Sequence, residues 1–146
     1  MRNLLTSTLL AVAVAGPAMA ADYGVVTINS PVYAGALPAC SEPGVVASIG
    51  DRFAYQDAHI LHSGVLIASI GGIHERGYKF GAPGFIDRRF CGATAWLSNG
   101  RKSEVVYMIE GPGTGFAGFG WHVQSCLPGY DPYRVYDASC RTIRPH

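Results

Sequence analysis

Four cysteines restrict the folds open to this chain more than any other feature of its sequence. They are Cys40, Cys91, Cys126 and Cys140, and no two of them form a C-x-x-C motif of the kind used by zinc and thioredoxin-type redox sites. An even number of cysteines in an exported chain is typical of disulfides. Of the three possible pairings we favour Cys126–Cys140, which closes a short loop. The remaining pair, Cys40–Cys91, then ties the early part of the chain to its centre.

The N-terminal segment MRNLLTSTLLAVAVAGPAMA predicts export. One positive charge precedes an apolar stretch that is interrupted by Pro17 and is too short to span a bilayer. Ala18 and Ala20 are small residues at the positions that a signal peptidase reads. We therefore expect a secretory signal peptide over residues 1–20. The expected mature protein is bacterial, periplasmic or extracellular, and has no N-terminal cysteine for a lipid anchor.

The rest of the chain has the size of one domain. Residues 21–39 are rich in small residues and proline and predict a flexible lead-in, with a short edge strand at GVVTI. Residues 40–146 are expected to form a single disulfide-bonded domain. The full chain has 11 Lys and Arg and 10 Asp and Glu, and loss of the leader removes Arg2, so the mature chain is formally neutral. Nucleic acid, anionic lipid and a membrane span after signal removal are therefore not expected.

The pattern of apolar residues predicts an α+β fold. Ser41 is a candidate helix cap and Pro43 suits a first helical turn, so we expect a helix over residues 42–58. Its apolar stripe consists of Val45, Val46, Ile49 and Phe53. SGVLIASIGGIHERGYKF predicts one long strand or two short ones, an Asn-Gly turn predicts a hairpin over residues 88–110, and WHVQSC predicts a further strand. The expected architecture is one N-terminal helix packed on a mainly antiparallel sheet of about four to five strands, with two disulfides.

The segment GPGTGFAGFG, residues 111–120, contains the G-x-G-x-x-G spacing of a dinucleotide-binding loop. Such a site needs a helix directly after the glycines, because the helix N-terminus receives the pyrophosphate. The residues that follow, WHVQSCLPG, predict a strand, and the chain ends too soon for a βαβ unit. NAD is therefore not expected, and no other cofactor is indicated.

Two phenylalanines leave two interpretations of this loop open. In the first, the loop only connects strands and Phe116 and Phe119 fold back onto the core, which is the outcome we expect. In the second, the loop is a mobile surface that presents aromatic side chains to a partner or a sugar. Trp121, Tyr130 and Tyr133 lie nearby in sequence and would enlarge that surface. These five aromatic residues are the candidate binding residues.

Candidate catalytic and metal-binding residues are scarce. Glu110 and His122 flank the glycine-rich loop and resemble a general acid–base pair, but no nucleophile motif accompanies them. His59 and His62 would share a face if the helix continued through His62, and His74 follows. Because H-x-x-H alone is no established zinc pattern, we assign neither a catalytic residue nor a metal ligand.

Several segments together resemble a known group of proteins: RFAYQDAH, IHERGYKF, RRFCGATAWLSNGRKSEVVYMIEGPG, GFAGFGWHVQSC and GYDPYRVYDASCR. The group consists of small exported four-cysteine proteins of rhizobia-like alphaproteobacteria, and the resemblance covers residues 40–144. The group is without an established activity, so the resemblance implies source and compartment and no functional residue.

The leading functional hypothesis is a non-enzymatic binding module of the cell envelope whose partner is an envelope protein or a glycan. An inhibitor of a hydrolase such as lysozyme is one concrete version. The alternative is a small metal- or acid–base-dependent hydrolase that uses the histidines or the Glu110–His122 pair.

Overall fold

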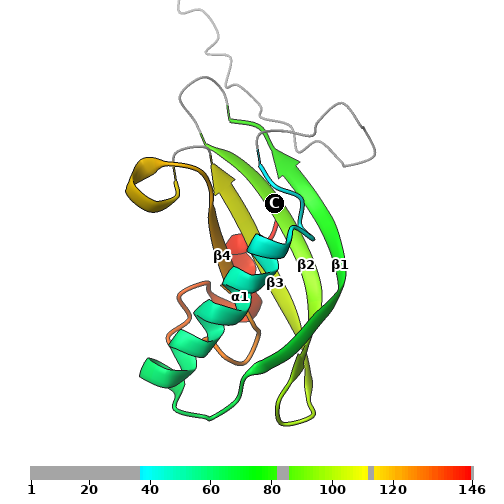
Figure 1. Cartoon of the computed structure of the whole chain (residues 1–146), viewed down its shortest axis with the longest axis vertical. Coiled ribbons are helices and arrows are strands. Elements are labelled where there is room, and N and C mark those ends of the chain that lie inside the picture. The colour runs from blue at the N-terminus through cyan, green and yellow to red at the C-terminus, as the bar shows by residue number, and fades with distance from the viewer. Residues whose placement is uncertain (1–36, 82–85, 112–113, 146) are drawn as a thin grey trace, which may run out of the picture.

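The computed structural model describes residues 37–81, 86–111 and 114–145. The expected signal peptide, the lead-in up to residue 36 and its GVVTI strand lie outside the described residues. Within them, one α-helix, α1 (Pro43–Gln56), packs on a four-stranded antiparallel sheet (Figure 1). The predicted α+β class is therefore confirmed. No helix in the described part of the chain is long and apolar enough to cross a membrane.

The four strands follow one another in space as they do in sequence. They are β1 (Ile67–Lys79), β2 (Asp87–Leu97), β3 (Lys102–Gly111) and β4 (His122–Cys126), and each pairs antiparallel with the next. β1 is one long strand whose register is interrupted by bulges, which decides between the two alternatives left open by its sequence. β1 and β4 form the two edges of the sheet.

The predicted hairpin is confirmed as β2 and β3. Its turn contains Asn99 and Gly100, and Gly100 has a φ of +80°. Glycine adopts this left-handed conformation without the steric cost that a Cβ would add. The short turn sets the register in which Cys91 lies opposite Tyr107 and Arg88 opposite Glu110.

Helix α1 buries three of the four residues of the apolar stripe that predicts it, and the fourth, Val46, is half-buried. Val45 and Ile49 are fully buried and Phe53 is nearly so, because residues three and four apart share one face of a helix. Their neighbours on the sheet are the inward-facing residues Cys91, Ala93, Ala95, Leu97, Val105, Tyr107, Ile109 and Val123. The N-cap residue is Glu42, whose side chain makes no capping hydrogen bond, so the expected Ser41 cap is wrong. The expected end near residue 58 lies in a π-helical turn, Asp57–Leu61, that continues the helix.

The opposite face of the sheet is partly covered by the C-terminal segment, residues 138–145, which contains the 3-10 helical stretch Ala138–Ile143. Ile143 belongs to a second apolar cluster, whose other buried members are Phe90, Val106, Met108, Cys126 and Cys140. The Cys126–Cys140 disulfide fastens this segment to the end of β4. The second disulfide, Cys40–Cys91, fixes the chain ahead of α1 to β2. Both predicted pairings are therefore confirmed.

Candidate functional site

The loop before β4 carries two phenylalanines into solvent. Its described part, residues 114–121, contains a short 3-10 turn, Phe116–Gly118, and is called the Phe loop below. Phe116 is 97% exposed and Phe119 is 80% exposed. The expected burial of these rings is therefore wrong, and the exposure that a binding surface requires is present. The reason is that no described segment covers the loop.

Close backbone contacts shape the Phe loop. A Cβ on Gly115 would lie 2.0 Å from the carbonyl oxygen of Phe119, so a larger residue would force the turn apart. The N–H of Phe119 donates to the carbonyl oxygen of Phe116 at 3.1 Å. At the base of the loop, the Thr114 hydroxyl donates to the carbonyl oxygen of Glu110 at 2.6 Å. These contacts hold both rings on the outside of a narrow turn.

The chain passes from the Phe loop directly into β4. The strand predicted from WHVQSC is thus confirmed as His122–Cys126. A dinucleotide site would need the N-terminus of a helix at this point. The described chain offers a strand there, so its backbone does not provide the pyrophosphate site that the glycine spacing imitates.

Of the other three candidate binding residues, Tyr130 and Tyr133 lie away from the two phenylalanines, and Trp121 is only partly exposed beside them. Trp121 is half-buried, and its ring packs beside Gly44 at the start of α1. Tyr130 and Tyr133 follow β4, whose five residues span about 17 Å. Figure 1 shows the Phe loop, in gold, and the segment after β4, in orange, at opposite ends of that strand. The structure therefore divides the predicted surface into two regions.

Tyr130 and Tyr133 also differ from each other. Tyr130 is half-buried and meets Phe53 edge-on, with ring centroids 5.4 Å apart. Tyr133 is 76% exposed. Only Tyr130 lines the groove described next.

A groove of about 640 Å³ lies between α1 and the C-terminal end of β4. One wall is α1 with its π-helical turn and the other is the segment after β4. The two walls are joined by a hydrogen bond of 2.8 Å from the Gln56 side-chain amide to the carbonyl oxygen of Tyr130. Arg52 and Tyr55 line the helical wall and were not among the predicted site residues. In the sequence, only their position outside the apolar stripe of α1 could have indicated an exposed site. Every exposed residue of a helix has such a position, so it does not single these two out.

Glu110 and His122 lie opposite each other on β3 and β4. Glu110 is buried, and both of its carboxylate oxygens have other partners. Arg88 Nε donates to Oε1 at 2.7 Å, and the Gln124 side-chain amide donates to Oε2 at 2.6 Å. Hydrogen bonds that involve a charged group are stronger than those between neutral groups. The arrangement suits a structural ion pair better than a carboxylate that exchanges a proton with His122.

His122 makes its contact with the helix. Arg52 Nη2 lies 3.1 Å from His122 Nε2 and 3.3 Å from Nδ1. Burial lowers the pKa of His122, the Arg52 charge lowers it further, and the nearby Glu110 charge acts in the opposite direction. The cause is that both burial and a neighbouring cation disfavour the imidazolium form.

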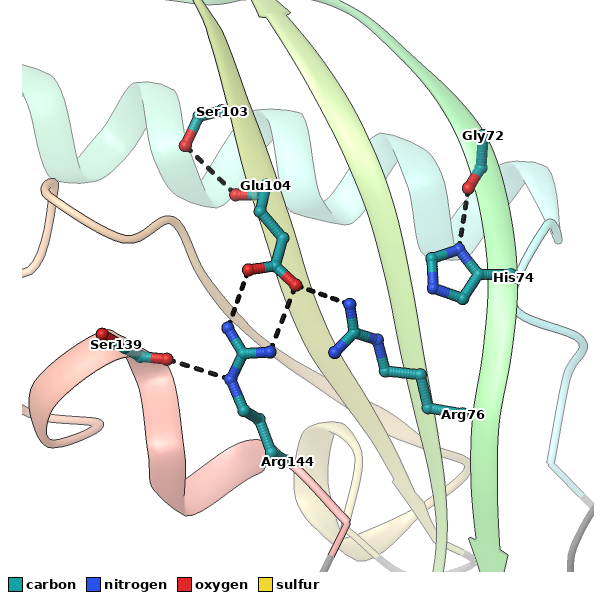
Figure 2. A network of polar contacts seen from close by, with 7 residues as sticks. All are labelled: Gly72, His74, Arg76, Ser103, Glu104, Ser139 and Arg144. Carbon is teal, nitrogen blue, oxygen red and sulfur yellow. Dashed lines mark hydrogen bonds and ion pairs between the residues drawn. The ribbon is translucent and has the colours of Figure 1, made fainter.

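A charged network occupies the sheet face opposite α1. Arg76 of β1 and Arg144 of the C-terminal segment converge on Glu104 of β3, with the helix behind the sheet (Figure 2). The closest N–O distances are 2.5 Å for Arg76 and 2.7 Å for Arg144. The hydrogen bonds from Arg144 and then Arg76 hold the pKa of Glu104 below its ordinary value. The network fastens the C-terminal segment to two strands.

The histidines considered as metal ligands have separate surroundings. His59 stacks on Tyr55 with ring centroids 4.0 Å apart, and its Nδ1 bonds the Tyr55 carbonyl oxygen. His62 ends the π-helical turn in a left-handed conformation, and His74 lies on β1, where its Nδ1 bonds the carbonyl oxygen of Gly72. In the described ranges, no three side chains of His, Cys, Asp or Glu are placed to hold a metal ion.

No family model, no curated protein and no solved structure matches the chain. The resemblance to small exported alphaproteobacterial proteins therefore stays a prediction, and function has to be argued from the site alone.

Proposed function

We propose that this protein is a non-enzymatic binding module and that the Phe loop is its contact surface for a partner protein. The observation that carries this proposal is the exposure of Phe116 and Phe119, at 97% and 80%. Burying a phenylalanine side chain contributes about 1.5 to 3 kcal/mol. Two such rings on one turn therefore offer a substantial gain to a partner that covers them.

The conformation of the loop supports the same function. The tight turn at Gly115 and the bond from Thr114 to Glu110 restrict the loop before it meets a partner. A restricted loop loses less conformational entropy on binding than a flexible one. The loop lies at one end of β4 (Figure 1), and its two exposed rings suit insertion into a concave surface.

The proposed compartment is the bacterial periplasm or the external medium. Two disulfides favour an oxidising compartment, and the expected signal peptide over residues 1–20 provides the route to it. In that setting an inhibitor of a hydrolase such as lysozyme is a concrete form of the proposal, because an aromatic loop can occupy a substrate cleft. The competing proposal of a hydrolase has less support, since Arg88 and Gln124 already engage the Glu110 carboxylate.

A double substitution tests the proposal. We expect Phe116→Ser/Phe119→Ser to keep the melting temperature of the wild type but to lose the partner in pull-downs from envelope extract and any inhibition of lysozyme. Tyr133→Ser is the matched control, because it removes an exposed aromatic ring at the other end of β4. A collapsed melting temperature in the double variant, or retention of the partner by it, would contradict the proposal. Capture of the same glycan by the wild type, the double variant and Tyr133→Ser would show that the glycan binds outside the Phe loop.

A further inference from the structure

The Phe loop and the groove are both apolar surfaces, and they lie at opposite ends of β4. The loop presents Phe116 and Phe119 to solvent. The groove is bordered by three exposed apolar side chains, those of Tyr55, Ile60 and Val135. Exposed apolar side chains that gather in one place mark surfaces that are covered in an assembly. The same chain therefore carries an apolar projection and an apolar groove that matches it in chemistry.

The contacts already made in the groove leave its rim accessible. The Gln56 side-chain amide bonds the carbonyl oxygen of Tyr130, and His59 stacks on one face of Tyr55. Tyr55 is nevertheless 65% exposed, and the exposed side chains of Ile60 and Val135 have no polar group that needs a partner. A ring that packs on this rim does not require either existing contact to break.

The groove has room for two aromatic rings. Its volume of about 640 Å³ lies within the range of about 300 to 1,000 Å³ that holds for pockets of drug-sized ligands. Two phenylalanine side chains together are no larger than such a ligand. The pair Phe116 and Phe119 therefore matches the groove in size.

Two-fold symmetry would make this contact reciprocal. Figure 1 shows the Phe loop, in gold, and the segment after β4, in orange, on the side of the sheet that β4 borders, away from β1. When two copies face each other along this side in opposite directions, the loop of each copy lies at the groove of the other. Both contacts then form at once, because a two-fold interface uses the same surface of both copies. The assembly is closed and stops at two copies.

Buried area and net charge both favour such a dimer. An aromatic side chain buries about 150 to 250 Å². Four phenylalanine rings and the groove walls that they cover therefore account for about 1,200 Å² or more, which reaches the range of specific interfaces. The full chain has a net charge of +1, and the chain without Arg2 is formally neutral. Two copies consequently do not repel each other strongly.

We propose that two copies of this chain form a symmetric dimer in which the Phe loop of each copy occupies the groove of the other. The dimer rests on the proposed function, because it keeps the contact surface covered until a partner protein displaces the second copy. Self-association and partner binding then compete for Phe116 and Phe119. This competition keeps both rings out of water while the partner is absent.

Sedimentation velocity of the disulfide-bonded mature protein tests the dimer. Between about 10 µM and about 1 mM we expect the mass to rise from that of one chain to that of two, and to stop there. Phe116→Ser/Phe119→Ser should weaken association by at least about thirtyfold, and Ile60→Ser/Val135→Ser, the groove variant, by about tenfold. Tyr133→Ser, outside the groove, is the matched control and should dimerise like the wild type. A wild type that stays monomeric or grows beyond two copies, or a groove variant that dimerises normally, would overturn the proposal.

A mixture of the two double variants tests whether the loop of one copy enters the groove of the other. The phenylalanine variant keeps an intact groove and the groove variant keeps an intact loop, so one of the two contacts forms in a mixed dimer. We expect the mixture to associate more tightly than either variant alone and more weakly than the wild type. Association no tighter than that of the separate variants would overturn the proposal, because packing of loop on loop or groove on groove gives that result.

Pull-downs from envelope extract separate the dimer from the proposed function. The groove variant leaves both phenylalanines in place, so it should capture the partner at least as well as the wild type. Loss of the partner by the groove variant would overturn the assignment of the groove to self-association. A monomeric wild type whose phenylalanine variant loses the partner would overturn the dimer alone. A dimeric wild type whose phenylalanine variant retains the partner would contradict the proposed function and support the dimer.

Discussion

Arg52 of α1 and His122 of β4 are 70 positions apart in sequence, yet Arg52 Nη2 lies 3.1 Å from His122 Nε2. A guanidinium only donates hydrogen bonds, so the ring nitrogen that receives this bond has to be unprotonated. The contact joins the helix to the strand between the Phe loop and the groove. It therefore makes one contact between α1 and β4 depend on the protonation state of one histidine.

We expect His122 to make the folded protein less stable as the pH falls below about 6.5, the ordinary pKa of histidine. Burial and Arg52 lower the pKa of His122 in the folded state, so on acidification the unfolded chain takes up this proton first. The stabilising contribution is thus present above the unfolded-state pKa and is lost as the pH falls through the folded-state pKa. His122→Gln should show a weaker dependence of unfolding free energy on pH between about 7 and 5. Urea denaturation at several pH values measures it, and identical pH slopes for both proteins would contradict the prediction.

Two glycine-to-alanine substitutions should have opposite effects on stability. A Cβ on Gly92 of β2 would lie 2.4 Å from Arg76 Nε and 2.8 Å from His74 Nε2, so Gly92→Ala forces both side chains to move and disturbs the Arg76–Glu104 ion pair. We expect a loss of about 1 to 3 kcal/mol. Gly50, inside α1, has no atom within 4 Å of an added Cβ, so Gly50→Ala should gain up to about 1 kcal/mol from reduced chain entropy and better helix propensity. Chemical denaturation measures the change in unfolding free energy of each variant. Stabilisation by both substitutions would show that the side chains around Gly92 move aside at little cost.

Removal of either disulfide should destabilise the domain, and the longer loop should matter more. Cys126 and Cys140 are 14 positions apart, and the chain-entropy model gives about 3 kcal/mol for such a loop. Cys40 and Cys91 are 51 positions apart, for which the same model gives about 4 kcal/mol. Urea denaturation of the two double-serine variants measures both losses. The reverse order would show that contacts within the folded state, rather than the unfolded chain, dominate the effect.

Tyr107 should contribute to stability through its buried hydroxyl group. It is fully buried and donates a hydrogen bond of 2.9 Å to the carbonyl oxygen of Cys40. We expect Tyr107→Phe to lose about 1 kcal/mol, because that carbonyl group stays buried without this donor. Burial also raises the pKa of Tyr107 to about 12, whereas an unfolded tyrosine ionises near 10.

The stabilising contribution of the neutral Tyr107 hydroxyl is therefore present below about pH 10 and is lost as the pH rises toward about 12. The phenylalanine variant should lose less stability over that range. Some alkaline dependence should remain, because the pKa of Tyr78 is also raised to about 12, chiefly by burial and then by its hydrogen bond to Asp87. Unfolding of both proteins at a series of alkaline pH values checks this, and an unchanged profile for Tyr107→Phe would contradict it.

Local sequence patterns were sufficient to predict most of the fold. Val45, Ile49 and Phe53 recur at the helical period and are buried together, because both the spacing and the burial follow from the geometry of one helix. Asn99 and Gly100 sit between two strand-forming runs, and a short turn leaves the chain few ways to continue. The disulfide pairs could be chosen for a similar reason, since the short loop between Cys126 and Cys140 costs less entropy to close than a longer one.

The sequence by itself therefore determined the class of fold and the hairpin, because these depend on residues near one another in the chain, and the interpretation of the cysteines as structural, because it depends on their number and spacing. The tertiary structure decided the rest. Phe116 and Phe119 are apolar residues of the kind that usually fill a core. Whether each ring is buried depends on where other segments of the chain run. The contact between Arg52 and His122, and the groove beside the end of β4, arise only when α1, β4 and the segment after β4 are packed together. That placement depends on packing between distant parts of the chain, which no local pattern encodes.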